Sequence, residues 1–361
     1  MIFSLDRAAA QAIQQAYEHC RDRPDRSALR SALWQHGRVF PLGDETCFET
    51  QWQWLNDGWE ALHQFHADRR LGHAWIVPLW MVWLPLAGQM IDWRNASAPV
   101  LLGLLGSQGS GKTTLTALLK LLLAQRGLRV LALSIDDFYL PYVDRQVLQG
   151  RDPRLIWRGP PGTHDLALLE DVLKQLKAGR STVSVPRFNK SAQNGAGDRQ
   201  GFESVGAVDL VLLEGWLVGT RPVALSQLQQ LPWPIVTPAD RAFAADMNLA
   251  LHRYQPLWAM LDRLAVLPLA DYRWSQQWRQ QAERERRDDL RSVVDHRGQA
   301  GMDDQTVQQF VAYFWKALHP DLFIAPLVCD PAWADWIVEI GADHQPQRWG
   351  FPGAAWELGK E

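Results

Sequence analysis

One segment of the chain has the residue types and spacing needed to hold a polyphosphate. Gly106-Ser-Gln-Gly-Ser-Gly-Lys-Thr113 matches the pattern G-x-x-x-x-G-K-[ST] at every position. The glycines matter because side chains would keep the backbone N–H groups of the loop away from the phosphates. A helix that starts at the end of the loop adds its dipole and its free N–H groups to the anion site. The residues expected to hold the nucleotide are Gly106, Ser107, Gly109, Ser110, Gly111, Lys112, Thr113 and Thr114.

Two side chains of this loop have specific chemical tasks. Lys112 is expected to reach the β- and γ-phosphates and to take part in catalysis, and the Thr113 hydroxyl is expected to ligate Mg²⁺. The context fits, because an apolar run with the pattern of a strand, 100–106, precedes the loop and a helical pattern follows it. The sequence therefore predicts a site for ATP and Mg²⁺.

Two carboxylates follow the next apolar run of the chain. Asp136 and Asp137 stand at the end of LRVLALSIDD. The carboxyl ends of the strands form the edge of an α/β sheet that binds ligands. A kinase that phosphorylates an alcohol needs a group at this edge to accept the hydroxyl proton, and an aspartate is suited to it. The alternative for an isolated aspartate here is a turn or a helix N-cap.

A third carboxylate, Glu214, ends the apolar run VDLVLLEG. We expect it to act on Mg²⁺, directly or through a bound water, as the acidic residue at a strand end does in P-loop enzymes. The alternative is a structural glutamate held in a salt bridge.

Cationic and hydroxyl side chains gather in the loops between these runs. The segments are RGPPGTHD (158–165), PRFNKS (186–191) and GDR (197–199). An anionic acceptor would use such arginines and lysines, with threonine and aspartate left for its hydroxyls. Asp165 could equally cap the helix that follows, and an isolated histidine such as His164 is more often an ordinary loop residue.

The surrounding pattern predicts the elements that position these residues. Residues 1–95 are Trp-rich and have helical spacing, and from Pro99 onward apolar runs alternate with amphipathic segments. We therefore expect an N-terminal helical region, 1–95, followed by a P-loop kinase domain, 96–361, that includes a lid and C-terminal helices. The fold class is α/β, a P-loop NTPase-type parallel sheet flanked by helices. The apolar run 75–91 contains Pro78 and Pro85, and we expect it to be a buried, Pro-broken helix pair and no membrane span.

Composition excludes several classes of function. Of 361 residues, 47% are apolar and 21% charged, with a formal net charge of −3, which is typical of a globular protein and not of a nucleic-acid binder. Cys20, Cys47 and Cys329 match no metal-ligand spacing, and so few cysteines suit a reducing compartment. The first residues, MIFSLDRAAAQ, lack an apolar core of signal-peptide length. We expect a cytoplasmic protein that needs neither membrane nor nucleic acid.

Several motifs together resemble a known family. SIDDFYL, RGPPGTHD, VPRFNKS with GDR, and VDLVLLEGW are similar in order and spacing to the P-loop D-glycerate 3-kinases of plant, fungal and cyanobacterial type. That family belongs to the group that contains uridine kinase, phosphoribulokinase and pantothenate kinase. The resemblance implies that ATP phosphorylates a small hydroxylated acceptor, with D-glycerate giving 3-phosphoglycerate.

The resemblance also implies roles for single residues. It makes Asp136 the general base with Asp137 as support. The family is basic around its acceptor, which places Arg187, Lys190 and Arg199 there, and the acceptor set as a whole is Arg158, Thr163, His164, Asp165, Arg187, Lys190 and Arg199. The segment 272–287 resembles a family segment. Within it, 279–287 is a candidate lid, whose arginines Arg279, Arg284 and Arg287 would reach the transferred phosphate, and the alternative is a helix with a solvated face. Where the family usually has aspartate before the Lys-Ser of the second loop, this chain has Asn189.

Two alternatives stay open at this point. One is a kinase for another small acceptor, of the uridine or pantothenate type. The other is a nucleotide-dependent regulatory protein with no acceptor, although the chain lacks the guanine-binding pattern N-K-x-D, since 189–192 reads NKSA.

Overall fold

A seven-stranded, mostly parallel sheet forms the centre of the computed structural model, which describes residues 2–4, 6–37, 44–94, 98–228, 231–292, 302–353 and 355–356. The strands are β1 Ile2–Ser4, β2 Val100–Gly106, β3 Val130–Ser134, β4 Thr182–Asn189, β5 Asp198–Gly206, β6 Leu210–Gly215, β7 Arg263–Leu267, β8 Trp336–Ile340 and β9 Pro346–Gly350. The order in the sheet is β1-β9-β8-β7-β2-β6-β3. The strands from β8 through β3 pair in parallel, and β9 and β1 add an antiparallel edge.

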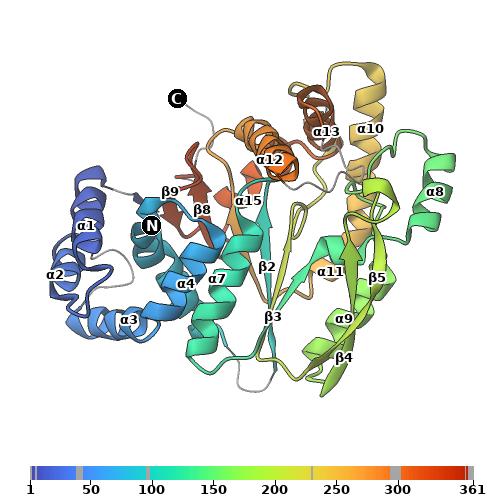
Figure 1. Cartoon of the computed structure of the whole chain (residues 1–361). Coiled ribbons are helices and arrows are strands. Elements are labelled where there is room, and N and C mark those ends of the chain that lie inside the picture. Colours follow the sequence, from blue (N-terminus) through green and yellow to red (C-terminus); the bar gives the residue numbers. More distant parts are fainter. Residues whose placement is uncertain are drawn as a thin grey trace.

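Helices cover both faces of this sheet (Figure 1). The α-helices are α1 Arg7–Cys20, α2 Ser27–His36, α3 Glu45–Asp57, α4 Trp59–Arg69, α5 Ile76–Pro78, α6 Leu84–Asp92, α7 Lys112–Gln125, α8 Tyr142–Arg151, α9 Leu166–Lys177, α10 Pro238–Ala250, α11 Gln255–Trp258, α12 Trp274–Ser292, α13 Asp304–Ala317, α14 Pro320–Phe323 and α15 Ala325–Cys329. Shorter turns are η1 His73–Trp75, η3 Ile135–Phe138, η4 Gln193–Gly195, η5 Leu225–Leu228 and η6 Leu251–Tyr254, and η2 Leu79–Trp83 is π-helical. The predicted fold class is confirmed.

The apolar strands are explained by this double cover. All seven residues of β2 are buried, because Leu102 and Leu104 pack with α7 and the N-terminal helices while Leu101 packs with α9 and α11. A strand with both faces covered has no solvent face that would require polar residues, which is why β2 and β6 read as continuous apolar runs.

The N-terminal helices pack directly against the kinase sheet. Trp54 donates its indole N–H to the Leu122 carbonyl of α7 at 3.2 Å, and α4 and α6 contact α7 in the same cluster. One cluster of buried apolar residues includes Leu55, Trp80 and Leu119. The strand β1 joins the first residues of the chain to β9 near its end, which the helical pattern of 1–95 did not indicate. A domain boundary near residue 95 stays a prediction, since the residues on its two sides share one core.

The apolar run 75–91 is buried, as predicted, but its backbone is more continuous than a broken pair of helices. It runs from α5 through the π-helical η2 into α6, and Trp80 and Leu86 are fully buried. The π-helical segment ends at Trp83, shortly before Pro85. Proline has no backbone N–H, so it would interrupt the hydrogen bonds of a regular α-helix at this point. Within the described ranges, no helix is both long and apolar enough to cross a membrane.

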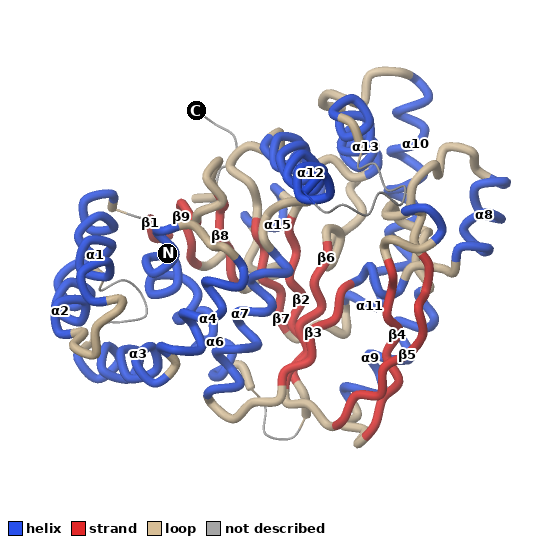
Figure 2. Tube along the Cα trace, in the orientation of Figure 1, coloured by secondary structure: helices blue, strands red, loops and turns tan. Residues whose placement is uncertain are grey.

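A separate antiparallel hairpin, β4–β5, stands beside β3 at the edge of the sheet (Figure 2). It carries Arg187 and Asn189 on one arm, Lys190 in the turn that follows, and Arg199 on the other arm. The hairpin therefore brings the basic loop residues toward the carboxyl end of β3, where Asp136 lies.

Candidate active site

The P-loop joins the carboxyl end of β2 to the start of α7. Gly109 and Gly111 have φ values of 79° and 81°, a backbone region that residues with a Cβ rarely adopt. A Cβ at Gly106 would lie 2.6 Å from the Ser110 hydroxyl, which donates to the Ser107 carbonyl at 2.9 Å. Glycines are therefore required by the path of this loop, and the result is the cradle of backbone N–H groups that the motif predicts.

Lys112 begins α7 and turns its ammonium back over the loop. Its Nζ donates to the Ser107 carbonyl at 2.8 Å. Burial lowers the pKa of Lys112, and the nearby carboxylates of Glu214 and Asp136 oppose that shift. The three side chains thus share one small region, and a phosphate placed there would add the negative charge that favours the ammonium form.

Thr113 and Glu214 meet at the next strand of the sheet. The Thr113 hydroxyl donates to Glu214 Oε1 at 3.2 Å, and the backbone register sets Glu214 opposite Leu104 of β2 and Ser134 of β3. One hydroxyl and one carboxylate fit Mg²⁺, which usually keeps several waters and takes its other ligands from phosphates. No cluster of three or more metal-binding side chains occurs among the described residues, so the donor set is of this sparse kind.

Asp136 lies just beyond β3 in the turn η3, with its side chain 25% exposed. Its Oδ2 is 2.7 Å from the ammonium of Lys190, and it also accepts a hydrogen bond from the Tyr139 hydroxyl. Burial raises the pKa of Asp136, but Lys190 and Tyr139 outweigh burial and leave the pKa below its usual value. The carboxylate is therefore ionised and ready to accept a hydrogen bond from an alcohol.

Asp137 points away from this carboxylate, toward the hairpin. It accepts from the backbone N–H of Ser134, from the Arg187 guanidinium at 3.1 Å and from the backbone N–H of Phe188 at 3.2 Å. Burial raises the pKa of Asp137, and these donors only partly offset it. The geometry gives Asp137 the part of a connector between η3 and β4.

His164 is buried next to Asp136 and is contacted by two tyrosines. Its ring stacks on Tyr139 with centroids 4.6 Å apart, and its Nδ1 lies 2.7 Å from the Tyr254 hydroxyl. Burial lowers the pKa of His164 to about 4, against an opposing effect of Asp136, so the ring is neutral near pH 7. His164 is thus no ordinary loop histidine in contact with solvent.

The other predicted acceptor residues divide into two groups. Asp165 caps α9 through the Leu168 N–H, as one of its two predicted roles requires, and binds Arg199 at 2.9 Å with its second oxygen. Its contact with an acceptor stays a prediction. Thr163 is buried, and its hydroxyl donates to the Pro160 carbonyl at 2.8 Å and accepts from the Gly159 N–H, which stabilises the loop itself.

Arg158 and Arg187 also bind protein groups in this structure. Arg158 donates to the Gly195 and Ala196 carbonyls, both at 2.9 Å, and its guanidinium lies over the Phe188 ring. Arg187 binds Glu203 at 2.7 Å in addition to Asp137. Both arginines therefore connect the hairpin to neighbouring loops.

Asn189 stands at the end of β4 and makes a local turn. Its Oδ1 accepts from the Ser191 N–H at 2.9 Å, a bond that an aspartate makes equally well. Asparagine in place of the family's usual aspartate therefore removes a negative charge but preserves the turn that carries Lys190.

The candidate lid helix α12 covers the P-loop. Trp278 lies so close to Gly109 that a Cβ on that glycine would be 3.0 Å from its ring, and His344 stacks on Trp278 with centroids 3.9 Å apart. Arg279 pairs with the buried Glu283 at 2.7 Å, and Arg284 pairs with Asp304 of α13. The side chain of Arg287 lies outside the described residues. The arginines that are described thus bind within α12 and α13 in this structure.

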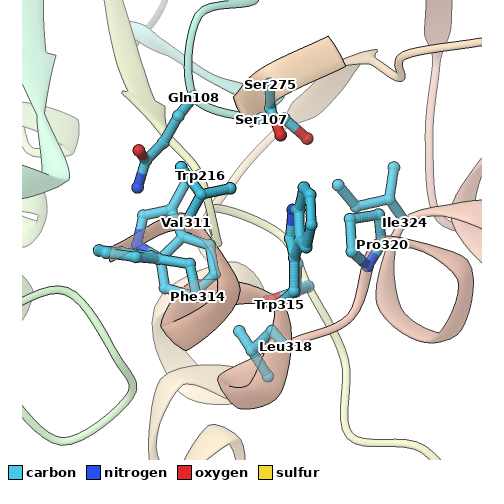
Figure 3. Close-up of a pocket in the computed structure, with 11 residues that line it drawn as sticks. Ser107, Gln108, Trp216, Ser275, Val311, Phe314, Trp315, Leu318, Pro320 and Ile324 are labelled. Atoms are coloured by element: carbon cyan, nitrogen blue, oxygen red, sulfur yellow. The ribbon is translucent and has the colours of Figure 1, made fainter. Parts of the chain in front are cut away.

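A mostly apolar pocket adjoins the P-loop beneath α12 (Figure 3). Ser107 and Ser275 lie at one end of it and Leu318 at the other, with Trp315 of α13 between them. The remaining lining residues are Gln108, Trp216, Thr220, Val311, Phe314, Pro320 and Ile324. Residues from four distant parts of the chain therefore meet beside the phosphate loop.

Three aromatic residues at the site were missed by the sequence analysis. Tyr139 is three positions after Asp136 in SIDDFY, so the motif contained a signal that could have been used. Trp216 donates its indole N–H to the Gly159 carbonyl at 3.2 Å and directly follows Glu214-Gly215. Tyr254 is 90 residues from His164 in the chain, and no local pattern marks it.

Several known proteins are similar to the chain in sequence or in fold. No protein-family model matches the chain. The chain is 34% identical over 263 residues to the chloroplastic D-glycerate 3-kinase of Arabidopsis thaliana. The matched region covers 68% of this chain and 53% of that protein. It is 31% identical over 226 residues to an uncharacterized kinase of Schizosaccharomyces pombe, covering 60% of this chain and 78% of that protein. The solved D-glycerate 3-kinase of Cryptococcus neoformans superposes with a TM-score of 0.60 at 25% identity, over 74% of this chain and 96% of that one.

The chain belongs to the P-loop D-glycerate 3-kinase family. The resemblance inferred from the motifs is thereby confirmed, together with the P-loop kinase fold. The chain spans about half the length of the plant relative. In this chain the P-loop, the acidic strand ends and the basic hairpin lie at one edge of the sheet.

Proposed function

We propose that the protein transfers the γ-phosphoryl group of ATP to the 3-hydroxyl of D-glycerate. One observation carries the proposal: the ammonium of Lys112, the Thr113–Glu214 pair and the ionised Asp136 meet at the carboxyl ends of β2, β6 and β3. A nucleotide site and a proton acceptor at one edge suit phosphoryl transfer to an alcohol. The names of the plant and fungal relatives support glycerate as the acceptor.

In this proposal the P-loop holds the triphosphate. Backbone N–H groups of 106–113 and the start of α7 bind the phosphates, with Ser110 and Thr114 as further contacts, and Lys112 exchanges the Ser107 carbonyl for phosphate oxygens. Thr113 and Glu214 would hold Mg²⁺, which would neutralise charge on the phosphates.

Asp136 orients the acceptor and takes its proton. The glycerate oxygen forms a bond to the γ-phosphorus as the bond between that phosphorus and the β,γ-bridging oxygen of ATP breaks. The hydroxyl proton passes to Asp136. When the acceptor binds Asp136, we expect Lys190 to move away from that carboxylate. Its side chain is 64% exposed, and only its ammonium contacts Asp136. Once released, its charge is available to the glycerate carboxylate.

The remaining acceptor residues follow from the hairpin and the 158–165 loop. We assign direct contact with glycerate to His164, Lys190 and Arg199, with Asp165 fixing Arg199. Arg158, Thr163, Asp137 and Arg187 are assigned to holding the loops that carry them. Arg279, Arg284 and Arg287 stay candidates for the lid, since α12 already lies over Gly109.

A coupled assay of ADP release tests the acceptor. D-glycerate, uridine, pantothenate and ribulose phosphate would each be supplied with ATP and Mg²⁺, and we expect turnover with D-glycerate. Turnover with a different acceptor alone would refute glycerate as substrate and retain a kinase. No acceptor-dependent turnover with any of them would favour a nucleotide-dependent regulatory protein. A cytoplasmic location is part of the proposal and is supported by the small number of cysteines in the chain.

A further inference from the structure

Backbone N–H groups of Gly162 and His164 donate to the hydroxyl of Tyr254, and the ring of His164 lies beside it. The Gly162 backbone N–H donates to it at 2.9 Å, and His164 Nδ1 lies 2.7 Å from it. Tyr254 is fully buried, and burial raises the pKa of its phenol far above neutral pH, so the hydroxyl keeps its proton. A buried hydroxyl proton needs an acceptor, and the Gly162 N–H can only donate.

These constraints determine the tautomer of His164. Because Tyr254 accepts from Gly162, its own proton goes to His164 Nδ1, which must therefore be the unprotonated ring nitrogen. Burial lowers the pKa of His164 to about 4, so the neutral ring carries a single proton near pH 7. That proton is on Nε2, at the opposite edge of the ring from Tyr254.

The resulting Nε2–H is a buried donor next to the candidate base. Only 4% of His164 is exposed, and Nε2 has no hydrogen-bond partner among the described residues. The ring stacks on Tyr139, whose hydroxyl binds Asp136, so His164 as a whole lies beside the candidate base. Arg199 binds the Tyr139 carbonyl and Asp165, and its Nε is a second buried donor without a partner in the same described region.

We propose that Tyr254 is a positioning residue that holds His164 as the Nε2–H tautomer, so that Nε2–H donates to an oxygen of a small carboxylate-bearing acceptor. The proposal rests on the proposed kinase function for the identity of the acceptor. Its tautomer part rests on the Gly162–Tyr254–His164 contacts alone. With the other tautomer, an imidazole lone pair would face the acceptor, and lone pairs repel carboxylate oxygens.

Nitrogen-15 NMR of the full chain labelled at histidine tests the tautomer without any turnover. The His164 signals would be assigned by their loss in His164→Gln. In the wild-type protein near pH 7 we expect an unprotonated Nδ1 and a protonated Nε2. In Tyr254→Phe, which lacks the hydroxyl proton, we expect a mixture of tautomers or the Nδ1–H form. Tyr17→Phe is the matched control, since Tyr17 is also buried and its hydroxyl accepts from Trp75 far from the site.

Kinetics of the same variants test the contact with the acceptor. Losing one buried hydrogen bond corresponds to about a 3- to 10-fold effect. We expect Tyr254→Phe to raise the KM for D-glycerate by that factor with an unchanged KM for ATP, and Tyr17→Phe to change neither. The amide N–H of His164→Gln lies near the position of Nε2 and should retain more glycerate affinity than His164→Ala.

The outcomes distinguish a failure of the positioning role of Tyr254 from a failure of the proposed kinase function. A wild-type His164 protonated on Nδ1, or a Tyr254→Phe variant whose tautomer is unchanged, overturns the positioning role of Tyr254. An equal rise in the KM for ATP and for glycerate also overturns it, because a general loss of structure has that signature. Absence of glycerate turnover in the wild type refutes the proposed function instead, and the tautomer measurement remains decisive for Tyr254. If Tyr254→Phe does not fold, the tautomer seen in the wild-type spectrum and the glycerate affinity of His164→Gln still test the proposal.

Discussion

The ammonium of Lys190 lies 2.7 Å from Oδ2 of Asp136 and so joins the tip of the β4–β5 hairpin to the carboxyl end of β3. The two residues are unequal partners. Asp136 is largely buried among Tyr139 and His164, whereas most of the Lys190 side chain is in solvent. An exposed ion pair adds little stability, so this contact is better understood as a means of keeping a buried carboxylate ionised.

Replacing the candidate base should slow turnover strongly and leave nucleotide binding intact. In Asp136→Asn the amide keeps the size of the side chain but cannot take a proton, and we expect kcat to fall by about 10²- to 10⁴-fold. The Kd for ATP, measured by calorimetry, should change little, since the P-loop backbone supplies most phosphate contacts. Asp144→Asn on the exposed surface of α8 is the control and should behave as wild type. A variant that retains full turnover would exclude Asp136 as the base.

Removing the cation beside Asp136 should shift the pH profile in a defined direction. Burial raises the pKa of Asp136 and Lys190 lowers it, with the lowering dominant. In Lys190→Met the lowering charge is lost, so the pKa of Asp136 should rise and the acidic limb of the kcat/KM profile should move to higher pH. Lys190→Arg keeps the charge and should leave the limb near its wild-type position. A shift to lower pH, or the same shift in both variants, would contradict this account.

The position of the candidate active site at one edge of the sheet could be predicted from sequence, because its main residues follow from local patterns. Asp136 and Glu214 each stand at the end of an apolar run, Lys112 follows another such run across the P-loop, and parallel strands bring these ends together. The direction of Asp137 could not be predicted, since it depends on Arg187 and Phe188, about 50 residues later in the chain.

The structural features that the sequence did not predict all depend on contacts between distant segments of the chain. Tyr254 reaches His164 from η6, and the three residues of β1 find their partner in β9 at the other end of the chain. The residues of β1 read as the lead-in to a helix, because a three-residue strand carries too little alternation to be distinguished. Pairing with a distant edge strand, and not local propensity, determines its conformation.

The Mg²⁺ assignment predicts a specific loss in Glu214→Gln. The amide keeps the hydrogen bond from Thr113 but removes the charge that a divalent cation prefers. We expect the Mg²⁺ concentration needed for half-maximal turnover to rise by about 10- to 100-fold. Glu170→Gln, in an exposed i,i+4 pair with Lys174 of α9, is the control. An unchanged Mg²⁺ titration would assign Glu214 a structural role.

A surface carboxylate away from the site should make stability depend on pH. Asp209 accepts two bonds from the Arg129 guanidinium, both at 3.0 Å, and one from the Arg129 backbone N–H, and these interactions lower its pKa to about 2. A carboxylate whose pKa is lower in the folded state contributes stability above its unfolded pKa and loses it as pH falls toward the folded pKa. Asp209→Asn should therefore lower the free energy of unfolding by about 1 kcal/mol at pH 7, after allowance for the exposure of Arg129.

Denaturant titrations at pH 7 and pH 2.5 measure this difference. Near pH 2.5 the unfolded carboxyl is protonated and much of the wild-type advantage is gone, so the two proteins should approach each other in stability. A difference that stays constant across this range would show that the hydrogen bonds matter and the charge does not.

Two glycines with similar backbone angles separate backbone strain from function. Gly109 has φ 79° in the P-loop and Gly127 has φ 75° after α7, but only Gly109 has a neighbour, Trp278, within 3.0 Å of an added Cβ. Alanine at either position should cost about 1 kcal/mol or more in unfolding free energy, because both need a left-handed backbone.

Only Gly109→Ala should also weaken ATP binding. Its methyl group would displace either the loop or the Trp278 ring, and loss of a hydrogen bond to a charged phosphate corresponds to roughly a 10- to 100-fold rise in Kd. Gly127→Ala should bind ATP as wild type does, since no described atom lies within 4 Å of its Cβ. Chemical denaturation and calorimetry on both variants give the comparison. Equal ATP affinities would mean that the approach of α12 to Gly109 is unimportant for the nucleotide site, whereas weak binding by Gly109→Ala alone would link the lid helix to the phosphate loop.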